Sequence, residues 1–141
     1  FTVTSPPGKL RHPAILVEDR VAVTPMVDGI RFVGTMELGL PNNKTNPRRV
    51  EGMKEAIPAY YPAFRQFDIG SVPVWSGHRP CTPDGMPYLG RTAKFENLTI
   101  AAGHAMMGMS LGPVSGRLVA ELICGDKPSI ALDLLSPERY A

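Results

Sequence analysis

The 141-residue chain lacks the features that mark several classes of protein. It has no long unbroken apolar run, because polar and charged residues and Pro113 interrupt its most apolar region, residues 100–123. The chain itself is therefore not expected to cross a membrane. Its 15 basic and 13 acidic residues are scattered and leave a net charge of only +2. The sequence therefore shows no cluster of basic residues that would bind nucleic acid.

Cysteine is equally scarce. The spacing of Cys81 and Cys124 fits neither a metal-binding pair nor a disulfide framework, so we expect two free thiols and a cytoplasmic location. The spacing of His78 and Cys81 could suit a metal, but no second ligand pair accompanies them and no metal site is predicted. The chain also lacks an initiating methionine. It begins with Phe1 inside a strand-like run, which indicates a piece of a longer protein.

The composition suits one globular domain, with 43% hydrophobic and 20% charged residues. Strand-like runs at residues 14–19, 20–26 and 29–38 predict an antiparallel meander, with a turn signal at Asp28 and Gly29. Two further strands are expected at residues 72–77 and, strongly buried, at 97–103. With two helices packed against a mostly antiparallel sheet, the predicted fold class is α+β.

The first helix is expected to begin with Asn46 as its N-cap and Pro47 at its first position. Pro58 and Pro62 mark its end. Its apolar face contains Val50, Met53 and Ile57, and its polar face contains Arg48, Arg49, Glu51, Lys54 and Glu55.

The second helix is expected to run from Ser110 or Leu111 to Cys124, with Gly125 ending it. Its predicted apolar stripe consists of Leu111, Val114, Leu118 and Leu122.

The first motif with chemical potential is SGHRPCTPDGMPYLG, residues 76–90, whose prolines and glycines predict an irregular, rigid loop. Arg79 lies near its start, and a planar guanidinium can donate two parallel hydrogen bonds to a carboxylate. A loop arginine taken alone is more often part of a salt bridge. Asp84 and Gly85 predict a turn that could fix Arg79 through its neighbours.

The second motif is AAGHAMMGMSLGPVSG, residues 101–116. It predicts a strand, a turn of small residues, and a helix whose first N–H groups are free to bind an electron-rich ligand edge. Gly103 and Gly108 would let the backbone approach a flat ligand closely. A glycine-rich turn of this kind can equally serve tight packing alone.

Taken together, the two motifs resemble the C-terminal region of the FAD-dependent D-amino-acid oxidase superfamily, closest to bacterial D-amino-acid dehydrogenases and their glycine-oxidase relatives. The upstream segment RVAVTPMVDGIRFVGTMELG also resembles the substrate-domain sheet of that family. The resemblance implies that residues 1–75 are part of the substrate-binding domain and residues 76–141 the C-terminal part of the FAD-binding domain. The chain has no G-x-G-x-x-G element, so the N-terminal dinucleotide-binding half is expected to be absent.

The resemblance also implies roles for individual residues. Arg79 would pair with the substrate carboxylate. The helix that follows the turn would direct its N-terminus at the flavin ring, and His104 is alternatively a structural histidine bonded to backbone carbonyls. Where some relatives have a second arginine, this chain has Met106. The residues expected along the flavin are Gly103, His104, Met106, Met107, Gly108, Met109 and Ser110.

The implied activity of the parent protein is oxidation of a D-amino acid, or a related small amine acid, to the imino and keto acid by hydride transfer to FAD. The fragment alone would be inactive. Its implied partners are the amino-acid substrate and the missing N-terminal half, and the parent could be linked to a quinone or attached peripherally to the inner membrane.

Two other hypotheses stay open on the residues alone. The chain could be a non-catalytic binding or assembly module with a degenerate form of this fold. It could also belong to an enzyme of the same superfamily that acts on glycine, sarcosine or a hydroxyproline.

Overall fold

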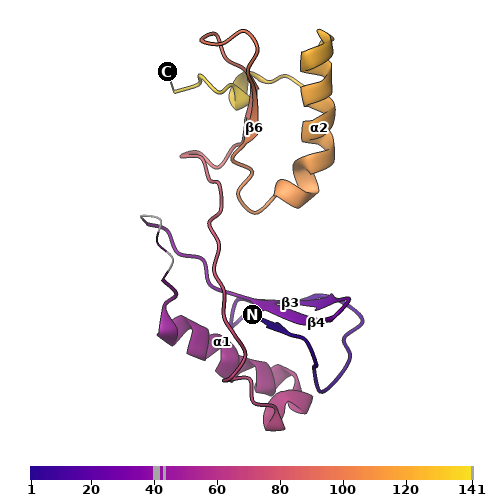
Figure 1. The fold of residues 1–141 in the computed structure, drawn as a ribbon, viewed down its shortest axis with the longest axis vertical. Coiled ribbons are helices and arrows are strands. Elements are labelled where there is room, and N and C mark those ends of the chain that lie inside the picture. The colour runs from indigo at the N-terminus through magenta and orange to yellow at the C-terminus, as the bar shows by residue number, and fades with distance from the viewer. Residues whose placement is uncertain (40–41, 43, 141) are drawn as a thin grey trace. The chain divides into compact units, whose positions relative to one another are not determined.

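The computed structural model describes residues 1–39, 42 and 44–140, and the chain divides into two compact units (Figure 1). Unit 1 comprises Phe1–Gly77, and unit 2 begins at His78. The division lies two residues beyond the domain boundary expected from the sequence. The assignment of the two units to a substrate domain and an FAD domain stays a prediction.

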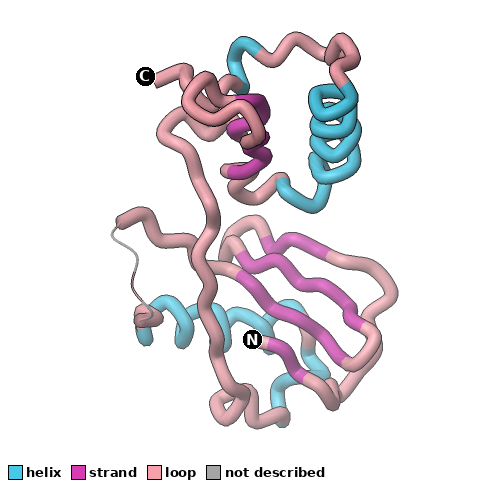
Figure 2. Tube along the Cα trace, turned by 45° about the horizontal axis from the view of Figure 1, so that its top comes forward, coloured by secondary structure: helices cyan, strands magenta, loops and turns pink. Residues whose placement is uncertain are grey.

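Unit 1 contains a four-stranded antiparallel sheet in the order β1-β4-β3-β2 (Figure 2). The predicted meander is confirmed for β2 to β4, and β1 adds at the edge beside β4. β4 ends at Val33, five residues earlier than expected. Val33 is opposite Ala22, the second residue of β3, so β4 ends where β3 nearly begins. The strands are β1 (Thr2–Val3), β2 (Ala14–Leu16), β3 (Val21–Met26) and β4 (Gly29–Val33).

One face of this sheet forms the hydrophobic core with helix α1 (Pro47–Tyr60) and the 3-10 helix η1 (Pro62–Gln66). Alternate side chains of β3 and β4 are buried, as the strand period of two requires. Phe32 is fully buried, and its ring meets that of Phe64 edge to face at 5.5 Å between centroids. Ile57 of α1 is buried in the same cluster.

Helix α1 begins as its sequence predicts. The Asn46 side-chain oxygen accepts hydrogen bonds from the backbone N–H groups of Arg48 (3.1 Å) and Arg49 (3.4 Å), and Pro47 takes the first helical position. The expected end is wrong in part, because α1 continues through Pro58 to Tyr60. Pro58 lies in the last turn of α1, where it removes the one backbone bond that its N–H would make and leaves the preceding turns intact.

Two expectations are wrong: that Lys54 lies on the polar face of α1, and that residues 72–77 form a strand. A contact between Lys54 and the segment at residues 70–72 bears on both. Lys54 is buried rather than on the polar face, and its ammonium donates to the carbonyls of Gly70 (2.7 Å) and Val72 (3.3 Å). Residues 72–77 form no strand. Val72 and Val74 still pack against the core. The alternating apolar pattern of residues 72–77 therefore reflects burial of an extended segment, which Lys54 bonds in place of a partner strand.

Unit 2 contains a two-stranded antiparallel sheet, a long helix and a short 3-10 helix. The strong burial expected at residues 97–103 is wrong for the strand, because β6 is only partly buried in this chain. α2 begins two to three residues before its predicted start, and the left-handed Gly125 (φ 79°) ends it as expected. The elements are β5 (Tyr88–Arg91), β6 (Thr99–Ala102), α2 (Gly108–Cys124) and η2 (Asp133–Leu135).

The predicted α+β class is confirmed, since both sheets are antiparallel and a helix packs beside each. On α2, Leu118 is buried as predicted, while Val114 is exposed and Ser115 takes the buried position next to it. Over the described residues, no helix has both the length and the apolar character that membrane crossing requires.

The N-cap of α1 generates a first prediction. Asn46→Ala removes the acceptor for two helix N–H groups and is expected to lower the free energy of unfolding by about 1 kcal/mol. Urea unfolding of the 141-residue chain measures this. Asn97→Ala, at an exposed loop position, is the matched control and should stay within about 0.5 kcal/mol of the wild type. Equal effects of the two substitutions would contradict the capping role.

Candidate functional site

Arg79 lies at the start of an irregular loop, residues 79–87, that leads into β5. Its side chain is exposed, and among the described residues it makes no hydrogen bond, ion pair or ring contact. The alternative expectation of a salt-bridged loop arginine is therefore wrong for this chain. An arginine with all five donors unused can bind an anionic group from outside.

The loop is attached to the second motif by backbone contacts. The N–H of Ala105 donates to the carbonyl of Pro80 (3.1 Å), and Cys81 forms an isolated antiparallel bridge with His104. These contacts bring the residue after Arg79 beside the turn that precedes α2. The two motifs predicted from the sequence therefore lie together within unit 2.

The turn itself packs tightly at one end. Gly103 has a φ of +81°, and a Cβ added there would lie 2.5 Å from the Cγ2 atom of buried Thr82. Ala105 also adopts a left-handed conformation, at φ +48°, which is strained for a residue with a side chain. Gly103 thus serves close packing between the two motifs, one of the two roles considered for it.

The other end of the turn is open. The side chains of three methionines are more than half exposed, and an added Cβ at Gly108 would meet only His104, at 3.7 Å. Met107 is the N-cap of α2 and supplies no side-chain acceptor, so its first N–H groups lack a capping side chain. The exposed methionines are Met106, Met107 and Met109.

His104 connects the turn to the helix. Its Nε2 atom shares a hydrogen bond of 2.8 Å with the hydroxyl of Ser115, which is buried on α2. The structural role considered for this histidine is supported, but its partner is a hydroxyl rather than a backbone carbonyl. The bond joins the turn to the second turn of α2.

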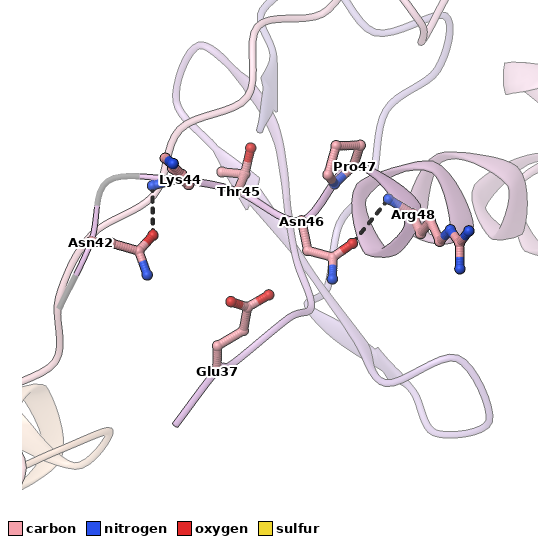
Figure 3. A pocket seen from close by; sticks show the side chains of 7 residues that line it. All are labelled: Glu37, Asn42, Lys44, Thr45, Asn46, Pro47 and Arg48. Carbon is pink, nitrogen blue, oxygen red and sulfur yellow. Dashed lines mark hydrogen bonds between the residues drawn. The ribbon is translucent and has the colours of Figure 1, made fainter. Parts of the chain in front are cut away.

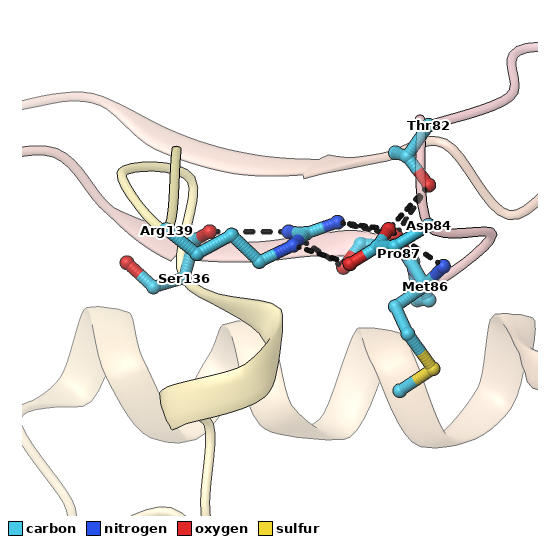
Figure 4. Close-up of polar contacts among 6 residues, drawn as sticks. All are labelled: Thr82, Asp84, Met86, Pro87, Ser136 and Arg139. Carbon is cyan, nitrogen blue, oxygen red and sulfur yellow. Dashed lines mark hydrogen bonds and ion pairs between the residues drawn. The ribbon is translucent and has the colours of Figure 1, made fainter. Parts of the chain in front are cut away.

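Arg139 is the residue of unit 2 that sequence reasoning missed (Figure 4). Its guanidinium binds Asp84 in a bidentate pair, with Nε to Oδ2 and Nη2 to Oδ1 both at 2.9 Å. It also donates to the carbonyls of Met86 (2.6 Å), Pro87 (3.4 Å) and Ser136 (3.1 Å). The SPERY segment gives no periodic or motif signal that would reveal this contact, which spans 55 residues.

Aromatic rings flank the same guanidinium. Its central carbon lies 4.1 Å from the ring centroid of Tyr88 and 5.1 Å from that of Tyr140. The hydrogen bond from Arg139 is the main reason that the pKa of Asp84 is well below its ordinary value of 3.8, although desolvation opposes it. Bonds from Tyr140 and from the backbone N–H of Met86 add to the lowering of this pKa.

Other candidate features lie in unit 1. Tyr60, at the end of α1, bonds Asp19, which raises the pKa of Tyr60 to about 12. An open hollow of about 650 Å³ lies at the start of α1 (Figure 3) and contains none of the predicted site residues. It is lined by Glu37, Asn42, Lys44, Thr45, Asn46, Pro47 and Arg48.

Comparison with known proteins identifies the family. The model of the DAO family, described as FAD dependent oxidoreductase, matches residues 1–122. The chain belongs to this family, as its two motifs predicted. It is 42% identical over 123 residues to a D-amino acid dehydrogenase of Methylobacterium radiotolerans, a match that covers 86% of this chain and 28% of that protein.

Solved structures agree on the fold. Glycine oxidase from Geobacillus kaustophilus superposes with a TM-score of 0.68 and 28% identity, over 86% of this chain and 32% of the oxidase. L-amino acid deaminase from Proteus vulgaris gives a TM-score of 0.63 at 24% identity, over 86% of this chain and 30% of the deaminase, and supports the fold alone. The chain thus spans about a third or less of the length of the relatives it matches.

The close packing at Gly103 generates a second prediction. Gly103→Ala places a methyl group against Thr82 in a left-handed conformation and is expected to cost at least about 1–2 kcal/mol of unfolding free energy. Adding Thr82→Ser removes the clashing methyl group and should recover part of this loss. Chemical denaturation of the chain measures both.

Gly116→Ala is the matched control for Gly103→Ala. Gly116 lies in α2, and an added Cβ there would meet nothing within 4 Å. Alanine should therefore stabilise the chain by about 0.5–1 kcal/mol. A destabilisation by Gly103→Ala no larger than the change at Gly116 would contradict the packing role.

The lowered pKa of Asp84 generates a third prediction. The unfolded chain binds a proton at Asp84 near pH 3.8, whereas the folded chain binds it only at lower pH. The stabilisation from this carboxylate is therefore complete well above pH 3.8 and is lost as the pH falls below it. The difference in unfolding free energy between the wild type and Asp84→Asn should shrink between pH 6 and pH 2, as followed by denaturation at each pH. A difference that stays constant with pH would contradict it.

Proposed function

We propose that this chain is the C-terminal part of an FAD-dependent oxidoreductase that oxidises a D-amino acid to an imino acid, which water hydrolyses to a keto acid and ammonia. The observation that carries the proposal is Arg79, which has no partner among the described residues and lies on a loop bonded to the turn before α2. The 42% identity to a D-amino acid dehydrogenase supports the substrate class.

In this proposal Arg79 binds the substrate carboxylate. Two parallel N–H groups of a guanidinium match the two oxygens of a carboxylate, so the contact orients the amino acid as well as attracting it. The charge of Arg79 is available because no acidic residue of unit 2 is paired with it, in contrast to Arg117 and Arg139. Orientation of the Cα–H bond is the main catalytic contribution assigned to this chain.

The turn before α2 and the first residues of α2, together residues 103–110, have a structure that suits a flavin ring. The backbone at Gly108 has space for a flat ligand, and the start of α2 offers N–H groups without a capping side chain. The partial positive charge at this helix end would stabilise negative charge that develops on a ring edge beside it. The thioether side chains of Met106 and Met107 would provide an adaptable apolar wall.

When bound, FAD supplies the acceptor for a hydride from the substrate. The residues of this chain would orient that substrate and help to stabilise charge, and His104 would hold the turn through Ser115. The fit concerns the ring alone, because the sequence contains no G-x-G-x-x-G element for the ADP moiety. The remaining part of the site would come from the portion of the relatives that this chain does not span.

The exposed apolar surface of unit 2 agrees with such a missing portion. Met109 is 95% exposed and Ile123 is 61% exposed on α2, and the sheet of this unit has only two strands. A two-stranded sheet is marginally stable unless further structure packs on it. A cytoplasmic location, with a quinone link or a peripheral attachment to the inner membrane, belongs to the same proposal, and the free thiols of Cys81 and Cys124 favour a reducing compartment.

The experiment that tests the function uses the complete protein containing this chain. Purified protein should carry a flavin absorption spectrum that bleaches without oxygen when a D-amino acid is added. Glycine and sarcosine belong in the same screen, because glycine oxidase has the same fold. A complete protein that binds no flavin, or a flavin that no amino acid reduces, would favour a non-catalytic module instead.

Arg79→Lys generates a fourth prediction. Lysine keeps the charge but loses the paired donors, so kcat/KM for the amino acid should fall about tenfold or more, the size of one charged hydrogen bond. Steady-state kinetics on the complete protein measure this. Arg117→Lys, an exposed arginine paired with Glu121 on α2, is the control and should change kcat/KM by less than about twofold. A decrease in kcat/KM of less than about twofold for Arg79→Lys would contradict binding of the substrate carboxylate by Arg79.

A further inference from the structure

The loop that carries Arg79 is held at its far end by a residue from outside the family match. Arg139 follows η2 near the C-terminus, beyond the residues 1–122 matched by the family model. A guanidinium has five N–H donors, and Arg139 makes five hydrogen bonds. Four of them are to the loop, at Asp84, Met86 and Pro87.

Because all of its N–H donors are used, Arg139 has none left to bind a ligand. Its side chain is only 10% exposed and lies against the rings of Tyr88 and Tyr140. Arg79, in the same loop, is exposed and has no partner among the described residues. One arginine therefore maintains the loop, and the other is presented by it.

The loop also has internal bonds that transmit this anchoring. The Asp84 carboxylate accepts from the N–H of Met86 (3.0 Å), and the Thr82 hydroxyl donates to the carbonyl of Met86 (2.7 Å). Pro80 and Pro83 restrict the backbone between Arg79 and Asp84. The carbonyl of Pro80 is in turn bonded to Ala105 of the turn. The backbone between Arg79 and Asp84 therefore has few freely rotating torsions, and Asp84 is bound by Arg139.

We propose that Arg139 is a positioning residue for the substrate carboxylate: through Asp84 it holds loop 79–87 so that the Arg79 guanidinium stands at a fixed place beside the turn 103–110. This inference rests on the proposed function of Arg79. Arg139 is distant from Arg79 in the sequence, and Asp84, in the same loop as Arg79, connects the two. This role also explains why Asp84, in a loop of an otherwise open site, is so fully hydrogen-bonded.

The test uses Arg139→Lys and Asp84→Asn in the complete protein. Lysine cannot form the bidentate pair, and asparagine keeps the acceptor for Met86 but loses the charge. Either variant is expected to raise KM for the amino acid about threefold to tenfold, with a smaller change in kcat and an unchanged flavin spectrum. Arg117→Ala, which removes an exposed pair on α2, is the control for loss of an arginine pair elsewhere in unit 2 and should leave KM unchanged.

A double-mutant cycle separates positioning from mere stability. If Arg139 acts through Arg79, then Arg139→Lys should lower kcat/KM by less than about twofold in a protein that already carries Arg79→Lys. A full threefold to tenfold loss in that background would overturn the proposal. If Arg139→Lys does not fold, Asp84→Asn takes its place in the cycle, because it removes no packing volume.

Hydrogen exchange on the complete protein gives a readout independent of activity. The amides of Met86 and Ala105 should exchange faster in Asp84→Asn, whereas the amide of Leu111 in α2 should not change. Unchanged exchange at Met86 and Ala105 would overturn the anchoring.

The outcomes distinguish this inference from the proposed function. If Arg79→Lys leaves kcat/KM unchanged, Arg79 does not bind the substrate carboxylate, and Arg139 cannot position it for that role. An impaired Arg79→Lys enzyme, together with wild-type KM in both Arg139→Lys and Asp84→Asn, would overturn the positioning role alone.

Discussion

The bidentate contact between Arg139 and Asp84 is the interaction on which the architecture of unit 2 depends. It joins the segment after α2 to the loop before β5, across 55 residues of sequence. Charge-assisted bonds of this geometry constrain direction as well as distance, since both nitrogen–oxygen pairs must align. The contact closes unit 2 around its two-stranded sheet, and Arg79 lies in the loop that it restrains.

Arg79 in this loop and Arg139, which binds the loop, have opposite surroundings. The guanidinium of Arg139 is sheltered by Tyr88 and Tyr140, and every one of its donors is used. Arg79 is exposed and unpaired among the described residues. A charged group without a partner gains most from binding an anion, whereas one with all donors used mainly stabilises the fold. The contrast is the physical basis for giving the first a binding role and the second a positioning role.

Local patterns accounted for much of the fold. Asn46 and Pro47 start α1 and Gly125 ends α2 as expected, because caps act through neighbouring backbone groups alone. The strand predicted at residues 72–77 failed because alternation reports a buried face, not the presence of a partner strand. The prediction that Lys54 lies on the polar face of α1 failed for a related reason. Its burial depends on the carbonyls of Gly70 and Val72, which are distant in sequence.

The sequence by itself determined the family, the α+β class and the two motifs, since these are written in residue types at short spacing. Only the tertiary structure decided that Arg79 has no partner among the described residues, that Gly103 packs against Thr82, and that Asp84 binds Arg139. Each of these facts depends on which distant segments meet. A charged side chain has no periodicity that names its partner, so contacts between distant residues become known only when the chain is folded.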